Sequence, residues 1–500
     1  MEKSIISYEN IRKQLKAYDY ALTIISWDSS TEAPKGCFED RSKMIGALSE
    51  MAYRLETSEE FVSSVETLHN NLDKLDKRLA HEIIEVKKGI DKTRKIPMDE
   101  YIEFSILMGS SQEVWAEAKK KSDYSIFKPT LEKIINFKRK QIKYLETEEL
   151  KGYDILLDYY EPGFTTKEYD LFFDVLKEKL VPFFKKINQM KLKYNDSFTK
   201  KLFPKQKQIE FCEYIQDVVC FDRNHGLMKE SEHPFTTGMG TTDVRFTNHY
   251  YEEDVASAIF SAIHELGHAI YNQQNDPALN DTLSSGGASL GIHESQSRML
   301  ENMIGRSKAF WETHFSKLLE LFPEQLQGIT VDDFYKHINR SEASYIRMDA
   351  DELSYPLHIM LRYDIEKGLF NGEYEVEDLN KVWNHLFKEY FGIEVKTDRE
   401  GILQDMHWGG GLIGYFPTYA LGSAYAAQIY HYMDQDINID EEIRTGKTTK
   451  INAWLKEKVH FFGSSLYPKG IIEIATNEEF NPHYYIDYLI NKYKDIYDIK

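Results

Sequence analysis

The sequence is poor in the residues that break helices or lock small domains together. Only 27 of its 500 residues are glycine and 13 are proline, and both residue types disfavour helix interiors. Their scarcity predicts long helices rather than many short strands joined by turns. The three cysteines, Cys37, Cys212 and Cys220, are too few and too scattered for a disulfide framework. They fit a reducing compartment, so we expect a cytoplasmic protein.

The chain also lacks an excess of positive charge and a long apolar segment. It carries 62 Lys and Arg against 82 Asp and Glu, a formal net charge of −20. An acidic surface disfavours nucleic acid and anionic membranes as partners. No run of 18 or more apolar residues occurs, and residues 1–14 contain no apolar signal core. We therefore expect no nucleic-acid partner and no membrane partner.

What the sequence does contain is the apolar pattern of amphipathic helices. Hydrophobic residues make up 42% and charged residues 29% of the chain, close to globular averages. Apolar spacing near 3.6 residues predicts helices at 8–25, 131–146, 168–194 and 312–321. The stretch 243–247 alternates and is rich in β-forming residues, which predicts a short strand in a small sheet. No internal repeat or linker rich in Ser and Gly interrupts the chain. We expect one mostly α-helical domain over 1–500.

The strongest functional signal is the sequence His-Glu-Leu-Gly-His at 264–268, inside a predicted helix. Two histidines four residues apart lie on one helix face, so both imidazoles can bind one cation. Glu265 projects beside that face, where it can act on a water molecule. This pattern is typical of zinc peptidases. The alternative is a core helix with two hydrogen-bonded histidines, but a chance match arises only about 0.05 times in such a chain.

A catalytic zinc site needs a third protein ligand, and the residues after this helix offer three candidates. The Ser-Ser-Gly-Gly loop at 284–287 allows the chain to reverse, and a second helix is predicted to begin near Ala288. That helix carries Glu294 and Glu301, and His293 is a rival ligand. Adjacent helix residues point about 100° apart, so only one of His293 and Glu294 can face the metal. Local chemistry leaves this choice open.

Motifs spread along almost the whole chain resemble those of one known family. They are WDSSTEAPKG at 27–36, LLDYYEPG at 156–163, HPF at 233–235, DVRFT at 243–247, HELGH at 264–268, GIHESQSR at 291–298, IRMDAD at 346–351, GILQDMHW at 401–408 and GYFPTYALGSAYAAQ at 414–428. On these motifs the chain resembles the carboxypeptidase Taq family of thermostable metallocarboxypeptidases. The resemblance implies a single helical fold with a deep active-site cleft, similar to neurolysin and angiotensin-converting enzyme.

The resemblance also implies an activity and a set of ligands. It implies a zinc-dependent carboxypeptidase that removes single residues from peptide C-termini with broad specificity, spares C-terminal proline, accepts cobalt in place of zinc and forms a homodimer. His264 and His268 match the first two metal ligands, and Glu294 matches the third. Glu265 matches the general base that takes a proton from water and returns it to the leaving amine.

The resemblance further points to two arginines that line the family's cleft. Arginine binds a free carboxylate through a bidentate, charge-assisted pair. Arg347 is the first candidate for this role and Arg245 the second, with Asp243 as a buried partner that orients Arg245. We also expect the strand at 243–247 to pair with the substrate backbone.

A donor must stabilise the oxyanion that forms during hydrolysis. Tyr415 and His407 are candidates for this donor, and Tyr419 is a further candidate that contacts the substrate. The alternative for each is packing in the core or a structural hydrogen bond. Glu301, seven residues after Glu294, is a candidate to orient an imidazole, with a surface carboxylate as the alternative.

Two other functions compete with a carboxypeptidase. An oligopeptidase or dipeptidyl carboxypeptidase would share the zinc chemistry and differ in how far the carboxylate anchor lies from the metal. A catalytically inactive helical binding protein would lack part of the ligand set, whereas His264, Glu265, His268 and Glu294 are all present.

Overall fold

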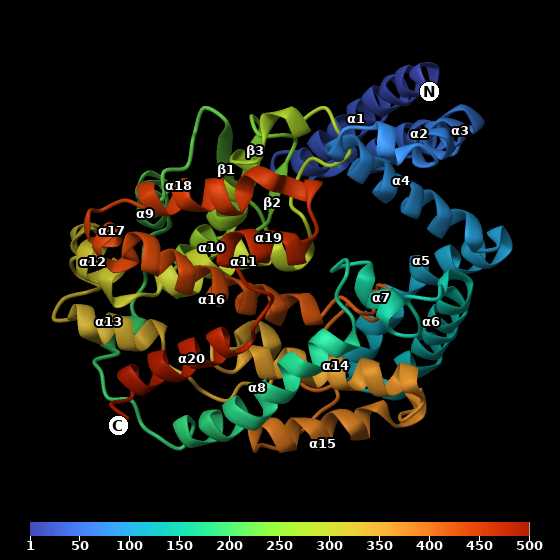
Figure 1. Cartoon of the computed structure of the whole chain (residues 1–500). Helices are drawn as coiled ribbons and strands as arrows, with labels where there is room; N and C mark the ends of the chain where they lie inside the picture. The colour runs from blue at the N-terminus through green and yellow to red at the C-terminus, as the bar shows by residue number, and fades with distance from the viewer. Residues whose placement is uncertain (500) are drawn as a thin grey trace.

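In the computed structural model, residues 1–499 are described, and most of them lie in helices around one small sheet (Figure 1). The N-terminal helices are α1 (Glu2–Thr31), α2 (Phe38–Glu56), α3 (Glu59–His69) and α4 (Lys77–Lys95). They project from the upper right of Figure 1. Apolar residues of α1, α3 and α4, among them Tyr8, Phe61 and Ile83, form a small hydrophobic cluster of their own. Helix α2 has no buried residue.

One buried acid joins these N-terminal helices to the rest of the molecule. Glu82 on α4 accepts hydrogen bonds from the Tyr8 hydroxyl at 2.9 Å and from Arg12 Nη1 at 3.0 Å, both on α1. It also accepts one from the backbone N–H of Leu283 at 2.8 Å. Leu283 is the first residue of the loop at 283–287. In the same loop, Ser285 Oγ lies 2.6 Å from Nζ of Lys16 on α1. The N-terminal helices are therefore fastened to the loop at 283–287.

The main hydrophobic core is built from the helices that follow. Those before the sheet are α5 (Met98–Lys121), α6 (Tyr124–Leu145), α7 (Asp154–Asp158), α8 (Thr166–Ile187) and α9 (Lys205–Val218). Those after it are α10 (Val255–Gln273), α11 (Leu290–Arg298), α12 (Lys308–Leu321), α13 (Val331–Ile338), α14 (Tyr355–Asn371), α15 (Leu379–Phe391), α16 (Pro417–Ile437), α17 (Ile439–Arg444), α18 (Thr449–Lys458), α19 (Pro468–Thr476) and α20 (His483–Ile496). Residues from all of these regions are buried in one cluster, with α10, α11 and α16 at its centre (Figure 1).

The sheet has three strands in the order β1-β3-β2. Strand β3 (Val244–Asn248) pairs in parallel with β1 (Gly226–Glu230) and antiparallel with β2 (Thr236–Gly238). The predicted strand at 243–247 is thus confirmed as β3. However, β3 is the central strand and has neighbours on both sides, so the expectation that it pairs with a substrate backbone is wrong. Strands β1 and β2 each have one edge with no partner strand among residues 1–499.

The predicted helices are confirmed, with one boundary wrong. The ranges 8–25, 131–146 and 312–321 lie within α1, α6 and α12, apart from one terminal residue. The range 168–194 corresponds to α8, but that helix ends at Ile187. Just beyond it, the Asn188 side chain accepts a hydrogen bond from the backbone of Ala343 at 3.0 Å. This contact holds the chain at Asn188, so the helix ends there although the helical spacing of apolar residues continues to residue 194.

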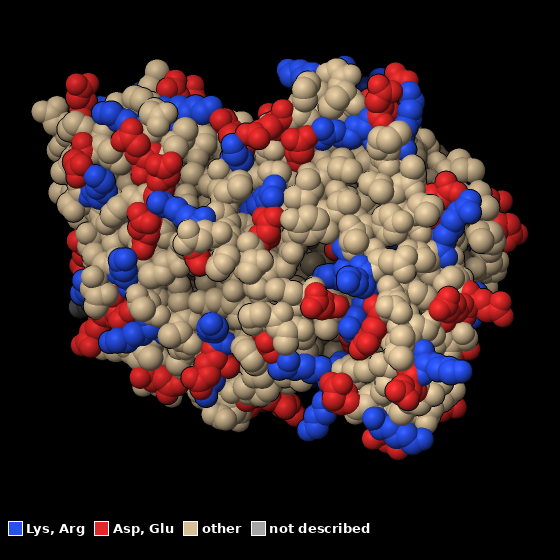
Figure 2. Space-filling view, turned by 90° about the horizontal axis from the view of Figure 1, so that it is seen from above, with Lys and Arg blue, Asp and Glu red and all other residues tan. Residues whose placement is uncertain are grey.

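No helix within residues 1–499 is both long enough and apolar enough to cross a membrane. The face of the molecule in Figure 2 carries positive and negative side chains interspersed, with a hollow near its centre. That face therefore has no continuous basic surface of the kind that binds a nucleic acid backbone.

Candidate metal centre

Helices α10 and α11 bring together the three residues expected to bind metal. His264 and His268 lie one turn apart on α10, and Glu294 lies on α11. Their candidate ligand atoms are all within 4.8 Å of one another. Glu294 Oε2 is 3.6 Å from His264 Nε2 and 3.5 Å from His268 Nε2. Two imidazoles and one carboxylate that converge in this way form a donor set suited to zinc.

Two glycines allow the helices around this group to approach closely. A Cβ on Gly267, the fourth residue of the His-Glu-Leu-Gly-His motif, would lie 2.6 Å from the backbone of Gln296 and Ser297 on α11. A Cβ on Gly422 of α16 would lie 2.8 Å from the Cβ of Glu294. The carboxylate of Glu294 thus fits between α10 and α16, because Gly267 and Gly422 carry no side chain where these helices contact α11.

The outer nitrogen of each imidazole already has a partner, which leaves the inner nitrogens for a cation. His264 Nδ1 lies 3.0 Å from Glu301 Oε2, and His268 Nδ1 lies 2.6 Å from His293 Nδ1. An acceptor on Nδ1 fixes the proton there and frees the Nε2 lone pair. Both Nε2 atoms face Glu294, so the donor set fits a divalent metal. His293 does not share this position, because it lies behind His268.

The carboxylates of the site are compensated by arginines. Arg298 Nε donates to Glu294 Oε1 at 2.7 Å, and Arg306 Nη2 lies 2.9 Å from Glu301 Oε1. Burial raises the pKa of Glu294, but the charges of Arg298 and His264 outweigh burial and hold the pKa below its ordinary value. Glu294 is therefore ionised and able to bind a cation at neutral pH.

Glu301 reaches His264 from an unusual helix segment. It lies in a π-helix, Met299–Gly305, that directly continues α11. A π-helix rotates the residues that follow it relative to an ideal α-helix, and such segments are frequent at functional sites. Helical spacing alone predicted that Glu301 shares a face with Glu294. The structure places it on His264 instead of on the surface.

Glu265, the expected base, is buried next to the ligand group. Its carboxylate Oε2 accepts a hydrogen bond from the Thr236 hydroxyl of β2 at 2.6 Å. Burial raises the pKa of Glu265 above its ordinary value, because the charged form loses solvation. Nothing local in the sequence identifies Thr236 as a partner of Glu265, since 29 residues separate them.

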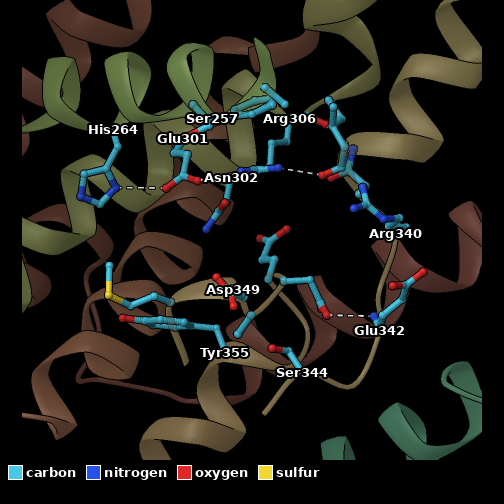
Figure 3. A pocket seen from close by; sticks show the side chains of 18 of the residues that line it. Ser257, His264, Glu301, Asn302, Arg306, Arg340, Glu342, Ser344, Asp349 and Tyr355 are labelled. Carbon is cyan, nitrogen blue, oxygen red and sulfur yellow. Dashed lines mark hydrogen bonds and ion pairs between the residues drawn. The ribbon is translucent and has the colours of Figure 1, made fainter. Parts of the chain in front are cut away.

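A cavity of about 980 Å³ opens beside this group. His264, Glu265, Arg298 and Tyr355 line one part of it. Figure 3 shows His264 and Glu301 on one side of the cavity and Tyr355 and Ser344 across from them. The Arg298 guanidinium lies over the Tyr355 ring, 4.5 Å from its centroid. Tyr355 therefore lies between the metal-ligand region and Arg347.

Arg347, the first candidate carboxylate anchor, lies beyond Tyr355 and is nearly buried. Its Nη2 lies 2.9 Å from Asp405 Oδ1, and its Nη1 donates to the Tyr355 hydroxyl at 3.4 Å. Arg362, which is fully buried, donates to the other oxygen of Asp405. The guanidinium of Arg347 also lies 5.3 Å from the Tyr419 ring centroid. One carboxylate thus orients two arginines, and the sequence did not predict that pairing.

The structure brings the three candidate donors together next to Arg347. The ring centroids of His407 and Tyr415 are 5.4 Å apart, those of Tyr415 and Tyr419 are 5.3 Å apart, and those of His407 and Tyr419 are 6.2 Å apart. Burial lowers the pKa of His407 to about 4, so its ring is neutral at pH 7. The group can therefore donate hydrogen bonds without carrying a second positive charge next to Arg347.

Arg245, the second candidate anchor, is not brought into this group. It bonds Asp243 as expected, with Nε–Oδ1 and Nη2–Oδ2 distances of 2.7 and 2.9 Å, but Asp243 is only partly buried, with 25% of its side chain exposed. On β3 its neighbours Val244 and Phe246 are fully buried, and successive residues of a strand point to opposite faces. Arg245 therefore points away from the core, and its guanidinium lies 5.8 Å from the Trp27 ring centroid of α1.

Comparisons with known proteins agree along the whole chain. The model of the carboxypeptidase Taq (M32) metallopeptidase family matches residues 7–493. Carboxypeptidase 1 of Bacillus subtilis (strain 168) is 45% identical over 489 residues, which cover 98% of this chain and 97% of that protein. A structure of Pyrococcus furiosus carboxypeptidase aligns with a TM-score of 0.94 and 34% identity over 99% of both chains. The M32 carboxypeptidase from Deinococcus radiodurans R1 aligns with a TM-score of 0.94 and 30% identity over 99% of this chain and 100% of that chain.

Proposed function

Because the chain belongs to the carboxypeptidase Taq (M32) metallopeptidase family and is thus a peptide hydrolase, we propose that it uses zinc to remove single residues from peptide C-termini with broad specificity. The observation that carries this proposal is the group His264, His268 and Glu294, whose ligand atoms converge while both Nδ1 atoms are engaged elsewhere. Three such ligands leave a position open in catalytic zinc sites. Cobalt would be held by the same atoms.

When bound, the metal supplies a Lewis acid that polarises a carbonyl and acidifies water. Glu265 takes the proton of the attacking water and delivers it to the leaving amine. Its burial supports this role, because a carboxyl group with a raised pKa exchanges protons more readily near neutral pH. The Thr236 hydroxyl holds the Glu265 carboxylate in place through the bond at 2.6 Å.

The residues beyond Tyr355 bind the end of the substrate and the developing charge. Arg347 holds the free carboxylate. It does not line the cavity itself, but its Nη1 donates to the hydroxyl of Tyr355, which does. Tyr415 and His407 donate to the oxyanion, and Tyr419 contacts the substrate. Arg245 remains the second choice for the carboxylate, although it lies on the outer face of the sheet.

One observation favours a different product. Arg340 lines the cavity and bonds the backbone of His337, but within residues 1–499 it makes no ion pair with a carboxylate. Arg347 and Arg245 are both paired. Figure 3 shows Arg340 across the cavity from His264. An anchor at Arg340 would suit an oligopeptidase or dipeptidyl carboxypeptidase, which needs a longer distance from the metal to the carboxylate.

Mass spectrometry of a peptide digest over time separates the two products. Loss of one C-terminal residue at a time, abolished by a zinc chelator and by C-terminal amidation, is the expected result. Arg347→Gln is then expected to raise KM for free-acid peptides far more than Arg340→Gln does, because a charged hydrogen-bonded pair is worth about 1.5–3 kcal/mol. Release of dipeptides, with the larger KM effect in Arg340→Gln, would replace the proposal with the dipeptidyl alternative.

We further propose that the protein is a cytoplasmic homodimer. The three cysteines are unpaired in the structure, which supports a reducing cytoplasmic location. A homodimer is supported by α2, which buries no residue and exposes Phe38, Met44 and Met51. Exposed apolar side chains gathered on one helix are typical of a surface that contacts a partner. Sedimentation of the purified protein would measure the assembly directly.

A further inference from the structure

His293, the alternative candidate for the third ligand, lies behind His268 as seen from the metal site. His293 follows the loop at 284–287 and lies on α11, next to Glu294. Its Nδ1 is 2.6 Å from His268 Nδ1, and its Nε2 is 3.1 Å from Asn272 Oδ1. Asn272 lies on α10, one turn after His268. The contacts therefore run from α10 to α11 and back to α10.

The direction of these hydrogen bonds follows from the acceptor at the far end. The Asn272 carbonyl oxygen can only accept, so His293 must donate from Nε2. A neutral imidazole that donates from Nε2 can only accept at Nδ1. His268 must then donate from its own Nδ1, which leaves its Nε2 lone pair toward Glu294. Asn272 thus determines, through His293, which nitrogen of His268 can bind a cation.

The surroundings of His293 keep its ring in this position. A Cβ on Gly287 would lie 2.6 Å from His293 Cδ2 and 2.9 Å from the ring of Tyr271. The Tyr271 ring contacts His293 edge to face, with centroids 5.2 Å apart. The Tyr271 hydroxyl in turn accepts the backbone N–H of Ala288 at 3.1 Å. The two glycines of the loop are explained here, because Gly286 has a φ of +103° and Gly287 leaves room for the imidazole.

The two candidate imidazole ligands are therefore supported differently. His264 is oriented by a carboxylate, Glu301, whereas His268 is oriented by a neutral ring and an amide. We propose that His293 and Asn272 are positioning residues that set the metal affinity of the site by fixing the tautomer and orientation of His268. The inference rests on the proposed metal site and adds two residues that contact neither metal nor substrate.

The test measures metal binding itself rather than turnover. Metal-free protein competes with a chromophoric chelator for Zn²⁺ and, separately, for Co²⁺, whose visible absorption reports the ligand geometry. Loss of an outer hydrogen-bond partner typically weakens metal binding by about 10- to 100-fold. We expect a loss of that size for His293→Leu, and of about tenfold for Asn272→Leu, because the second change leaves His293 free to adopt either tautomer.

Conservative variants separate orientation from simple disruption. Asn272→Asp keeps an acceptor for His293 Nε2 and is expected to bind zinc at least as tightly as the wild type. His293→Asn keeps an acceptor near the position of Nδ1 and is expected to recover most of the affinity lost in His293→Leu. Gln273→Leu is the matched control, because Gln273 neighbours Asn272 on α10 but bonds Asp222 away from the site. It should leave the affinity unchanged.

Several results would overturn the inference. One is a zinc dissociation constant of His293→Leu that stays within about twofold of the wild-type value. Another is an equal loss of zinc affinity in Asn272→Leu and Asn272→Asp. If His293→Leu does not fold, as judged by circular dichroism of the metal-free protein, the two Asn272 variants decide. The outcome is separable from the proposed function, since wild-type protein that binds zinc tightly but releases no C-terminal residue would contradict only the latter.

Discussion

Around the candidate ligands, each charged side chain has a partner of opposite charge or a hydrogen-bond donor. Glu294 bonds Arg298, Glu301 bonds Arg306 and His264, and Glu265 accepts from Thr236. Buried charges are tolerated only when they are compensated in this way. The site can therefore hold the carboxylates of Glu294, Glu301 and Glu265 close together without an uncompensated buried charge.

At Glu265, replacement by glutamine should separate metal binding from catalysis. The amide keeps the size of the side chain but cannot accept a proton, and general-base catalysis contributes about 10²- to 10⁴-fold to a rate. We expect Glu265→Gln to lower kcat by that order while zinc content stays at one per chain. Steady-state kinetics gives kcat, and metal analysis of the same sample gives its zinc content. Near-normal turnover at full zinc occupancy would remove Glu265 from the base role.

At Thr236, the hydroxyl and the methyl group can be tested separately. Thr236→Val keeps the shape of the side chain and removes the hydrogen bond to Glu265, and we expect kcat to fall roughly tenfold, which corresponds to about 1.4 kcal/mol. Thr236→Ser restores the hydroxyl and should restore kcat. KM should change little in both variants. Equal kcat values for Thr236→Val and Thr236→Ser would mean that the hydroxyl does not position Glu265.

The sequence predicted most of the residues of the site but not their partners. The spacing within 264–268 predicted two ligands and a base on one helix, because these contacts are local. Local spacing left the choice between His293 and Glu294 open, since either could face α10, and only the family resemblance pointed to Glu294. The pairings of Arg347 with Asp405 and of Glu265 with Thr236 join segments far apart in the sequence. Such contacts follow from tertiary packing and leave no periodic pattern to read.

At the scale of elements, the contact of α16 with α11 depends on a single missing side chain. A Cβ at Gly422 would lie 2.8 Å from the Cβ of Glu294, whereas one at Gly470 on α19 meets no atom within 4 Å. We expect Gly422→Ala to destabilise the protein by about 1–3 kcal/mol and to weaken zinc binding, because the helices must separate.

The same substitution at Gly470 serves as the control for Gly422→Ala. Alanine is a better helix former than glycine by about 1 kcal/mol, so Gly470→Ala should be neutral or stabilising. Thermal melting and zinc titration of both variants provide the comparison. If alanine stabilises the protein at both positions, then α16 and α11 can move apart without a loss of stability.

A buried carboxyl on α14 should make stability depend on pH. Burial raises the pKa of Glu366 to about 7, against an ordinary value of 4.5. The native state therefore holds a proton that the unfolded chain releases, so this contribution is complete below about pH 4.5 and declines as pH rises through about 7. The expected slope is about 1.4 kcal/mol per pH unit between those values.

Glu366→Gln tests this dependence. The amide cannot ionise, so the difference in melting temperature between pH 5 and pH 8 should shrink relative to the wild type. The variant loses some stability at every pH, because Glu366 accepts hydrogen bonds from Tyr153, Trp408 and Gly414. An unchanged difference between the two pH values would mean that Glu366 is ionised throughout this range.

Helix boundaries show where pattern and packing disagree. The apolar spacing of 168–194 continues past Ile187, but the chain leaves the helix where Asn188 bonds Ala343. The strand at 243–247 was identified from its composition, whereas its central place in the sheet depends on β1 and β2, which are short and weakly patterned. Element type was therefore predictable, and neighbour relations were not.

At the scale of the whole molecule, Glu82 is the most buried of several contacts that attach the N-terminal helices, which also include Arg78–Asp276 and Lys88–Tyr467. Removal of this buried carboxylate leaves the donors of Tyr8, Arg12 and Leu283 without an acceptor, at a cost of about 3–5 kcal/mol. We expect Glu82→Ala to lower the melting temperature and to make the connection between α4 and α5 sensitive to protease, while zinc binding persists.

Glu50→Ala is the control for this prediction. Glu50 pairs with Arg54 on the surface of α2, with 60% and 72% of the two side chains exposed, and such pairs contribute little. Limited proteolysis followed by mass measurement locates the cut in each variant. Equal protease resistance of Glu82→Ala and the wild type would show that the N-terminal helices are held by other contacts.

The loop at 283–287 contacts both the N-terminal helices and the candidate metal centre. Its first residue bonds Glu82, Ser285 bonds Lys16, and Gly287 packs against the ring of His293. Most surface loops accept inserted residues, because they make few contacts with the rest of the protein. This loop is fixed at both ends and in the middle, so an added or deleted residue would displace either the N-terminal helices or His293. We therefore expect related sequences to vary less in the length of this segment than in the identity of its serines.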